Sequence, residues 1–179
     1  MKLLQFNLPG RGRRAGVLEG AEVVDLTSAD PELRSVLDVL NRSVSAGKVV
    51  EDVVREVRPL AADVYAFADL NVSPSQANPH LDMPICAPEV WGFGVTYKRS
   101  AMDRDADSAS DIYTRVYFGE RPEVFFKATP PRCVGPNRAI AIRRDSNLTA
   151  VEPELAFVLG ANGQIVGYTI CNDVSAWDI

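Results

Sequence analysis

Histidine is nearly absent from this sequence of 179 residues, because His80 is the only one. A single histidine excludes a metal centre built from several imidazoles and argues against a histidine-based catalytic pair. The three cysteines, Cys86, Cys133 and Cys171, are widely spaced and form no CxxC pattern. We therefore interpret them as small buried hydrophobic residues.

Long apolar runs and an excess of positive charge are also missing. No apolar run is long enough to cross a membrane, and the first residues lack the apolar segment of a secretion signal. The net charge of −5 argues against general affinity for nucleic acid. From these absences we expect a cytoplasmic protein with neither a nucleic-acid nor a membrane partner.

The composition that remains supports a folded protein, since 46% of the residues are hydrophobic. The polar stretch 71–79 contains two prolines and little to bury, which is typical of a linker. It divides the chain into an N-terminal α/β module, residues 1–80, and a strand-rich part, residues 81–179.

In the first part, strands are expected at 2–8 and 15–26, the second interrupted by a turn at Glu19-Gly20. Asp30 before Pro31 predicts a helix start, and apolar residues at helical spacing lead to a stop at Gly47. A second amphipathic helix is expected at 49–57. These apolar stripes predict a core.

In the second part, three strands are expected at 88–97, 121–129 and 139–143. The charged stretch 100–110 predicts a loop, for which we favour a plain solvated loop over the alternative of a lid that covers a site. Gly92-x-Gly94 lacks the third glycine of a nucleotide-binding loop, so close backbone packing is its expected role.

The stretch 151–173 carries the strongest local signal, because Asn162-Gly163 is typical of a two-residue type I′ hairpin turn. Counting outward from it places Glu154 opposite Cys171 and Glu152 opposite Asp173. One face of this hairpin is then apolar and predicted to join a core. Its members are Leu155, Phe157, Leu159, Val166, Tyr168 and Ile170.

The other face gathers three carboxylates, those of Glu152, Glu154 and Asp173, at the open end of the hairpin. Neighbouring like charges need a cation, and oxygen ligands suit Mg²⁺, Mn²⁺ or Ca²⁺. The alternative is that these acids face water or pair with a base such as Arg143, Arg144 or Lys127. We favour the metal, because the register adds Asp173 to the Glu-x-Glu pair.

Four segments together resemble the fumarylacetoacetate hydrolase family, and within it the branch that acts on 2-keto-3-deoxy sugar acids. They are EVWGFGVTYKRS at 89–100, RPEVFFKATPPRCVGP at 121–136, EPE at 152–154 and GYTICNDVSAWD at 167–178. The resemblance implies an α+β fold in which the small N-terminal module precedes the first part of a mixed, mostly β roll. It also implies Mg²⁺ (or Mn²⁺ or Ca²⁺) on the three acids already gathered.

The implied substrate is a small 2-oxo acid that the metal chelates, so that the protons on C3 become acidic. Strand alternation puts Glu123 and Lys127 on one side, where Glu123 is the candidate acid/base and Lys127 an electrostatic partner. A surface ion pair is the alternative interpretation. The substrate-binding candidates are Thr96, Tyr97, Arg99 and Ser100, and a homodimer or homotetramer is expected.

Three departures from the family pattern matter. No histidine follows Tyr97, which removes the water-activating pair of the hydrolases and favours a dehydratase. Trp177 stands where the family carries an arginine. The family also continues past the position of Ile179, so we expect a fragment.

Three functions therefore stay open. The leading one is a metal-dependent dehydratase of 2-keto-3-deoxy sugar acids such as a 2-keto-3-deoxypentonate. The second is hydrolysis, decarboxylation or tautomerisation of acylpyruvates at the same kind of site. The third is an inactive chain that serves as a folding or assembly half.

Overall fold

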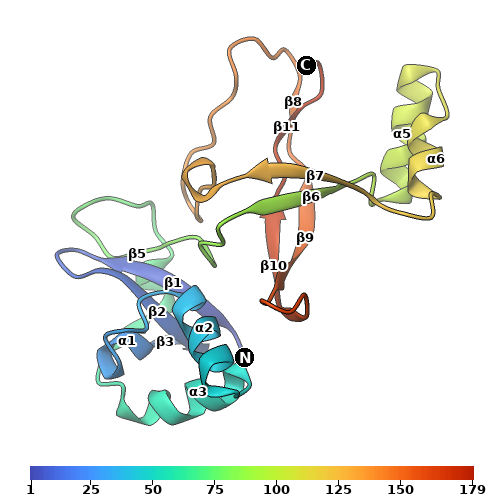
Figure 1. Cartoon of the computed structure of the whole chain (residues 1–179). Coiled ribbons are helices and arrows are strands. Elements are labelled where there is room, and N and C mark those ends of the chain that lie inside the picture. Colours follow the sequence, from blue (N-terminus) through green and yellow to red (C-terminus); the bar gives the residue numbers. More distant parts are fainter. The chain divides into compact units, whose positions relative to one another are not determined.

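The computed structural model describes all residues, 1–179, and mixes helices with strands throughout (Figure 1). It divides into two compact units. One holds residues 1–86 together with 133–179, and the other holds residues 87–132. Each is described by itself.

The N-terminal residues form a five-stranded antiparallel sheet with the order β4-β3-β2-β1-β5. Its strands are β1 (Leu3–Leu8), β2 (Gly12–Glu19), β3 (Glu22–Asp25), β4 (Val64–Ala66) and β5 (His80–Leu81). β1, β2 and β3 are joined as two consecutive antiparallel hairpins. The turn predicted at Glu19-Gly20 lies in the second of them. Gly20 has a φ of 61°, which suits a tight turn.

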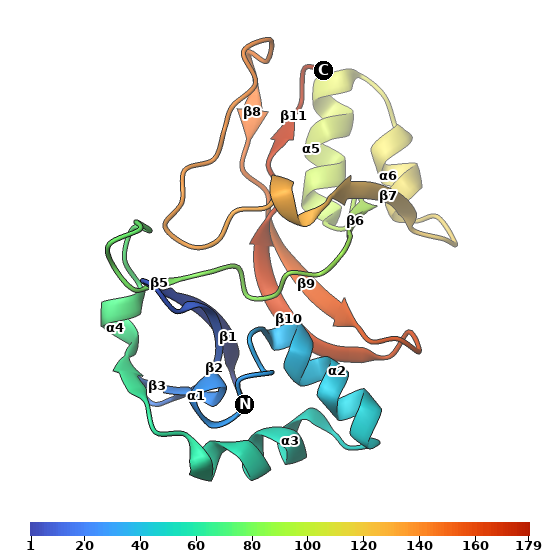
Figure 2. The same ribbon diagram turned by 60° about the vertical axis from the view of Figure 1, so that its left-hand side comes forward.

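The helices of this region are α1 (Leu26–Ala29), α2 (Val36–Ala46), α3 (Val50–Val57), the 3₁₀ helix η1 (Arg58–Leu60) and α4 (Phe67–Leu70). Figure 2 shows α2 and α3 along one side of the curled sheet. The predicted stop at Gly47 is confirmed, since Gly47 caps α2 with a φ of 63°.

The predicted start at Asp30 was wrong. Asp30 ends the short α1, and its N–H donates to the Leu26 carbonyl. The cap of α2 is Ser35, whose Oγ accepts from the Asp38 N–H at 3.1 Å. The apolar residues keep their spacing across the turn between α1 and α2, so the sequence pattern does not show where one helix ends and the next begins. The backbone hydrogen bonds show it.

Two apolar clusters form the core, one on each side of the N-terminal sheet. The first includes Ala15, Val17 and Val24 from the strands with Val39 and Val53 from α2 and α3. The second joins Phe6, Leu8, Val23, Leu70 and Leu81. Both clusters lie within residues 3–81, where the helical and strand stripes were predicted to be core.

Residues 87–132 contain the antiparallel pair β6 (Val90–Gly94) and β7 (Glu123–Ala128), the helices α5 (Lys98–Ser108) and α6 (Ile112–Tyr117), and the 3₁₀ helix η2 (Pro130–Arg132). The loop expected at 100–110 was wrong, because most of it lies in α5. Asp105 accepts hydrogen bonds from the Tyr113 and Thr114 N–H groups, both at 2.9 Å, and so ties α5 to the first turn of α6. Those backbone groups belong to another helix, so no local pattern reveals them.

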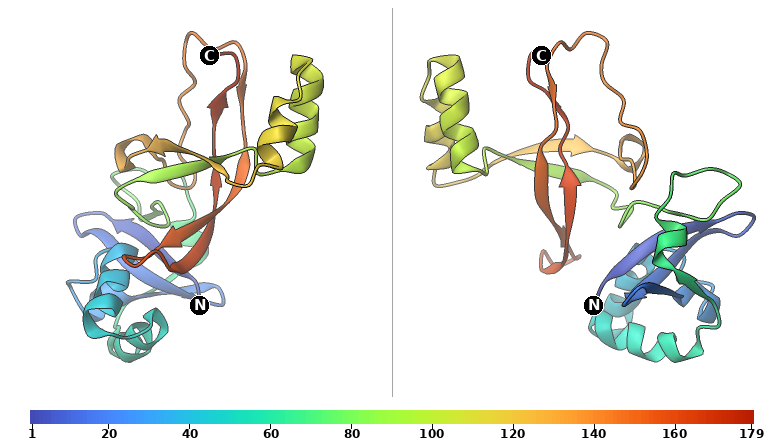
Figure 3. Two further views of the ribbon diagram at one scale, coloured as in Figure 1. Left: turned by 45° about the vertical axis from the view of Figure 1, so that its right-hand side comes forward. Right: turned by 180° about the vertical axis from the view of Figure 1, so that it is seen from behind.

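Residues 133–179 contain the pair β8 (Thr149–Ala150) and β11 (Ser175–Ala176) and the long hairpin of β9 (Pro153–Leu159) and β10 (Ile165–Asn172). Figure 3 shows β9 and β10 as one twisted two-stranded ribbon. The strand expected at 139–143 was wrong: Ile140 and Ile142 are exposed and no other strand pairs with this segment.

The apolar face predicted on the β9–β10 hairpin is present but is not buried. Ile170 is 78% exposed, Tyr168 66% and Leu155 65%. From residue 87 onward, Ala101 and Ala128 are the only buried hydrophobic residues. The expectation that this face joins a core within the chain was therefore wrong, because most of its side chains stay exposed.

Candidate metal and substrate site

The turn of the β9–β10 hairpin differs from the predicted type I′ turn. A type I′ turn needs a positive φ at both central residues, and only Gly163 has one, at 75°. The Gly163 N–H donates to the Gly160 carbonyl at 2.9 Å, and the Gly160 N–H donates to the Gln164 carbonyl at 2.8 Å. The loop therefore has three residues, with glycine at its left-handed last position.

The predicted register at the open end is nevertheless confirmed. The longer turn pairs Leu159 with Ile165, which is one residue out of the predicted register. A β-bulge between Ile165 and Gly167 then restores it. Glu154 consequently faces Cys171, and the Asp173 N–H donates to the Glu152 carbonyl at 2.8 Å.

The hairpin thus brings the backbones of Glu152, Glu154 and Asp173 to one end. All three residues are half-buried, and the Oδ1 atom of Asp173 is buried. Asn172 adds a cap, since its Oδ1 accepts from the Glu152 N–H at 2.9 Å. The paired strands therefore fix the positions at which these three acids leave the backbone.

Trp177 contacts the site in a way that sequence reasoning missed. Its indole Nε1–H donates to Glu152 Oε1 at 2.8 Å. The β8–β11 pairing positions it, because the Trp177 N–H donates to the Leu148 carbonyl at 2.9 Å. Trp177, which replaces the family's arginine, is therefore a neutral hydrogen-bond donor to one of the predicted metal ligands. The sequence signal for this contact was the departure from the family pattern at position 177.

Asp178 holds the segment that precedes β8. Its carboxylate accepts from the Asn147 N–H at 2.5 Å, the Leu148 N–H at 3.2 Å and the Ser146 hydroxyl at 2.8 Å. The backbone hydrogen bond from Asn147 and the hydroxyl of Ser146 lower the pKa of Asp178 below its ordinary value. Asp178 thereby stabilises the turn that anchors Trp177.

The donor chemistry of the three acids fits a hard divalent cation, since all their side-chain donors are oxygens. In the structure, no group of three or more His, Cys, Asp or Glu side chains is arranged to hold a metal ion. Coordination by Glu152, Glu154 and Asp173 would require their carboxylates to turn toward one another from the positions that the register gives them. Their role as ligands remains a prediction.

The acid/base candidate Glu123 lies at the start of β7, opposite Gly94. A Cβ on Gly94 would come within 3.1 Å of Glu123 Oε2, and the ring of Phe125 covers Gly92 in the same way. The predicted role of Gly92-x-Gly94 in close packing is thus confirmed. Lys127 is the extra residue of a β-bulge between the pairs Trp91–Phe126 and Val90–Ala128, so strict alternation from Glu123 ends before it.

The predicted substrate-binding residues lie together where β6 passes into α5. Thr96 and Tyr97 precede the helix, and Arg99 and Ser100 are in its first turn. Val95, just before them, has a φ of 54°, a conformation that strains a β-branched residue. Such strain is common beside functional segments, although it does not assign a role to any one side chain.

The two halves of the predicted site lie on different units. Residues 96–100, Glu123 and Lys127 belong to the unit 87–132, and the three metal-ligand candidates belong to the other unit. Arg99 is highly exposed and forms an ion pair with Asp103 at 3.7 Å along α5. Its guanidinium is therefore accessible to a carboxylate substrate.

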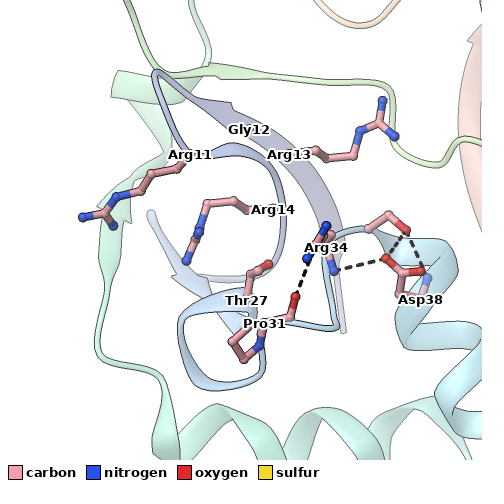
Figure 4. Close-up of a pocket in the computed structure, with 9 residues that line it drawn as sticks. Arg11, Gly12, Arg13, Arg14, Thr27, Pro31, Arg34 and Asp38 are labelled. Carbon is pink, nitrogen blue, oxygen red and sulfur yellow. Dashed lines mark hydrogen bonds between the residues drawn. The ribbon is translucent and has the colours of Figure 1, made fainter.

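A pocket of about 760 Å³ lies in the N-terminal region and is lined by none of the predicted site residues (Figure 4). Its lining residues are Arg11, Gly12, Arg13, Arg14, Thr27, Pro31, Arg34, Ser35 and Asp38. Three of the arginines pair with Asp25, Asp63 and Asp82. Because the positive charge is largely compensated, we assign this pocket no ligand.

Two proteins named as dehydratases are similar to this chain in sequence. A probable 2-keto-3-deoxyxylonate dehydratase from Haloferax volcanii is 43% identical over 168 residues, which are 93% of this chain and 55% of the relative. A 2-dehydro-3-deoxy-D-arabinonate dehydratase from Saccharolobus solfataricus is 52% identical over 101 residues, 54% of this chain and 34% of the relative. The resemblance to dehydratases of 2-keto-3-deoxy sugar acids is therefore confirmed.

Two solved structures are also similar to this chain. A 2-keto-3-deoxy-D-arabinonate dehydratase complexed with magnesium and 2,5-dioxopentanoate is 33% identical, with a TM-score of 0.69 over 99% of this chain and 57% of that one. A fumarylacetoacetate hydrolase from Exiguobacterium antarcticum, 24% identical with a TM-score of 0.56, shares the fold. The chain is a relative of these dehydratases and has a fold of the fumarylacetoacetate hydrolase type.

The chain spans about half the length of the relatives it matches, 55% of the Haloferax protein and 57% of the magnesium-bound dehydratase. No family model matches it. None of its helices combines the length and hydrophobicity needed to cross a bilayer.

Proposed function

We propose that this chain is part of an Mg²⁺-dependent dehydratase that acts on 2-keto-3-deoxy sugar acids, with a 2-keto-3-deoxypentonate as substrate. The observation that carries the proposal is the 43% identity to the Haloferax dehydratase across 93% of the chain. The magnesium-bound relative, which holds 2,5-dioxopentanoate, supports the same chemistry.

In this proposal residues 1–80 form the N-terminal module, and residues 81–179 form the first part of the catalytic β roll. Glu152, Glu154 and Asp173 hold the metal, as their all-oxygen donor set and shared end of the hairpin favour. Bound Mg²⁺ supplies Lewis acidity toward the carboxylate and 2-oxo group of the substrate. The working assembly is a homodimer or homotetramer.

The chain's own residues carry the proton transfers. Glu123 removes a proton from C3 and returns it to the C4 hydroxyl, which leaves as water. The 5-hydroxy-2-oxo-3-enoate formed in this way then loses a proton from C5 and gains one at C3, which gives the 2,5-dioxo acid by way of its enol. Lys127 stabilises negative charge, and Arg99 with Thr96, Tyr97 and Ser100 orients the substrate. A carboxylic acid can do both halves of this transfer in turn, which fits a site without histidine near Tyr97.

The test of the reaction is to incubate the purified protein and Mg²⁺ with 2-keto-3-deoxypentonate and, separately, with an acylpyruvate, and to identify products by NMR. We expect the sugar acid to lose water and give a 2,5-dioxo acid. Glu123→Gln should lose most of kcat while Mg²⁺ binding survives. Cleavage of the acylpyruvate to pyruvate and a carboxylic acid, with the sugar acid unchanged, would assign the hydrolase function instead.

The test of the metal site needs no activity. Millimolar Mg²⁺ should raise the melting temperature, because a ligand at a hundredfold excess over Kd adds about 2.7 kcal/mol of stability. The double variant Glu152→Gln, Glu154→Gln should lose the effect. Mn²⁺ and Ca²⁺ are compared in the same assay. An unchanged melting curve for the unaltered protein would contradict the assigned ligands.

The third possibility, an assembly half that is inactive alone, has a distinct outcome. The chain would then bind Mg²⁺ weakly and convert neither substrate, yet gain activity on addition of a polypeptide that supplies the rest of the relatives' length. Activity of the chain by itself would exclude this role.

A further inference from the structure

Cys86 and Cys133 flank one compact unit of the protein. The unit consists of residues 87–132, so one cysteine lies at the segment that enters it and the other at the segment that leaves it. Both side chains are half-buried, and neither forms a disulfide in the structure. The two cysteines are 47 positions apart in the sequence, so no local pattern shows that they flank the same unit.

Close contacts bring the entering and leaving segments together on both sides of the cysteines. On one side, β6 and β7 pair, with Val90 opposite Ala128. On the other, Gly135 lies so near the chain that a Cβ on it would be 2.8 Å from the Met83 nitrogen. Cys86 falls between Met83 and Val90, and Cys133 falls between Ala128 and Gly135.

No strand ladder joins the two contacts, because residues 130–132 form the 3₁₀ helix η2. The Gly135 contact is the one nearer to the cysteines: Cys86 lies three residues after Met83, and Cys133 lies two residues before Gly135. A disulfide needs Cα atoms about 4.4–6.8 Å apart, so the two segments that carry the thiols must lie side by side. The contact of Gly135 with Met83 brings these two segments together.

Side-chain contacts support the same arrangement. The Nε2 group of Gln5 donates to the Met83 carbonyl at 2.9 Å and to the Cys86 sulfur at 3.5 Å, so it fixes the Cys86 side of the pair. Desolvation, and then the charge of the neighbouring Cys86, raise the pKa of the Cys133 thiol. Cys171, in contrast, is exposed on β10, so its interpretation as a buried hydrophobic residue was wrong.

We propose that Cys86 and Cys133 are a disulfide-forming pair that closes the two connections to residues 87–132. With a small-molecule disulfide as oxidant, the Cys86 thiolate attacks one sulfur, forms a mixed disulfide and releases one thiolate. Cys133 then gives up its proton to water and attacks the Cys86 sulfur, which releases the second thiolate. Two protein thiols are oxidised, and one small-molecule disulfide is reduced to two thiols.

The consequence of this bond is a loss of freedom for the segment that it closes. The unit 87–132 carries Thr96, Arg99 and Glu123, so a bond across its base restrains the backbone connections of these residues. The closed loop also reduces the conformational entropy of the unfolded chain, so the oxidised protein should melt several degrees higher than the reduced one.

The test uses the Cys171→Ser variant equilibrated with an excess of oxidised glutathione at pH 8. We expect an intact mass lower by two hydrogen atoms, a proteolytic peptide linking Cys86 with Cys133, and a melting temperature raised by several degrees. Cys86→Ser and Cys133→Ser, each made in the Cys171→Ser background, are the matched controls, and neither should gain the cross-link or the shift.

Two results would overturn the proposal. One is accumulation of glutathione adducts on Cys86 and Cys133 without a bond between them, which would show that the thiols are out of reach. The other is cross-linking only between separate chains. The cross-link is measured on the folded protein by mass, so its outcome does not depend on whether the protein is a dehydratase.

Discussion

At the scale of single residues, Trp177 makes the contact that most changes the interpretation of the site. Its indole donates to one carboxylate oxygen of Glu152, while the backbone of Glu152 is fixed by Asn172 and Asp173. A donor to one oxygen of a ligating carboxylate orients the other oxygen for the metal. Trp177 is therefore a positioning residue for the proposed magnesium site.

Replacement of this indole gives the first prediction. Trp177→Phe should weaken Mg²⁺ binding by about tenfold or more, the usual cost of losing an outer-shell partner. The dissociation constant is measured by isothermal titration calorimetry. Trp91→Phe is the matched control, because Trp91 Nε1–H also donates to a glutamate at 2.9 Å, but this glutamate, Glu89, is not one of the three acids. Equal affinities for the two variants would contradict a role for Trp177.

Asp82 is the residue through which acid should destabilise the N-terminal module. Desolvation alone would raise the pKa of Asp82, but hydrogen bonds from the Met83 N–H, Arg13 and Asn7 outweigh it and hold the pKa below 3.8. The carboxylate is buried, and Arg13 Nε lies 2.9 Å from it. A depressed pKa contributes stability above about pH 4, and this stability is lost as the pH falls through the folded-state value.

The second prediction follows from this lowered pKa of Asp82. Asp82→Asn should lower the free energy of unfolding by about 1–3 kcal/mol at neutral pH, and its stability should fall less steeply than that of the parent below about pH 4. Urea denaturation at a series of pH values measures both. Asp63→Asn breaks a more exposed pair with Arg11 and should cost about 0–1 kcal/mol. A parent-like acid slope in Asp82→Asn would refute the assignment.

At the scale of elements, the β9–β10 hairpin shows how two local irregularities cancel. The three-residue turn moves the register by one position, and the bulge after Ile165 moves it back. Glycine is needed at position 163, where φ is 75°. The open end of the hairpin, which carries the acids, therefore depends on the geometry of the closed end.

The third prediction tests this dependence with two glycines of the same hairpin. A Cβ would meet nothing within 4 Å at either Gly163 or Gly167, so the two positions differ in backbone conformation alone. Gly163→Ala should destabilise the protein by about 1 kcal/mol, while Gly167→Ala should be neutral or slightly stabilising. Urea denaturation gives both values, and equal effects would show that the left-handed turn is not required.

At the scale of the whole molecule, the contrast between the two parts of the sequence is the main feature. Residues 3–81 hold both core clusters, whereas the strands after residue 87 leave large apolar side chains exposed. Exposed apolar faces of this kind mark surfaces that bind other protein. The β9–β10 face, defined by Leu155, Phe157, Leu159, Tyr168 and Ile170, is one such surface, since all five side chains are exposed.

The fourth prediction is that the purified chain associates through this β9–β10 face. Light scattering should give a mass above 19.5 kDa that rises with concentration. Ile170→Lys should shift the protein toward the monomer, whereas Ile142→Lys, which alters another highly exposed isoleucine that lies outside any strand, should not. A cooperative monomer of the unaltered chain at all concentrations would show that the face needs no partner.

The sequence by itself determined what depends on near neighbours along the chain. Strand alternation, the Gly47 stop and the spacing of apolar residues follow from backbone geometry within a few positions, and they predicted the N-terminal strands, α2, α3 and the long hairpin. The pairing of Glu152 with Asp173 agrees with the count from the turn only because the β-bulge after Ile165 offsets the one-residue shift of the three-residue turn.

Only the tertiary structure decided what depends on residues far apart in the sequence. The bonds from α6 to Asp105, the indole of Trp177 on Glu152 and the approach of Gly135 to Met83 each join segments that no local pattern connects. The same holds for burial: alternation shows that Leu155 and Ile170 share a face, but whether that face is covered depends on which surfaces meet it. In this chain that face is exposed, since long-range packing, unlike periodicity, is a property of the whole fold.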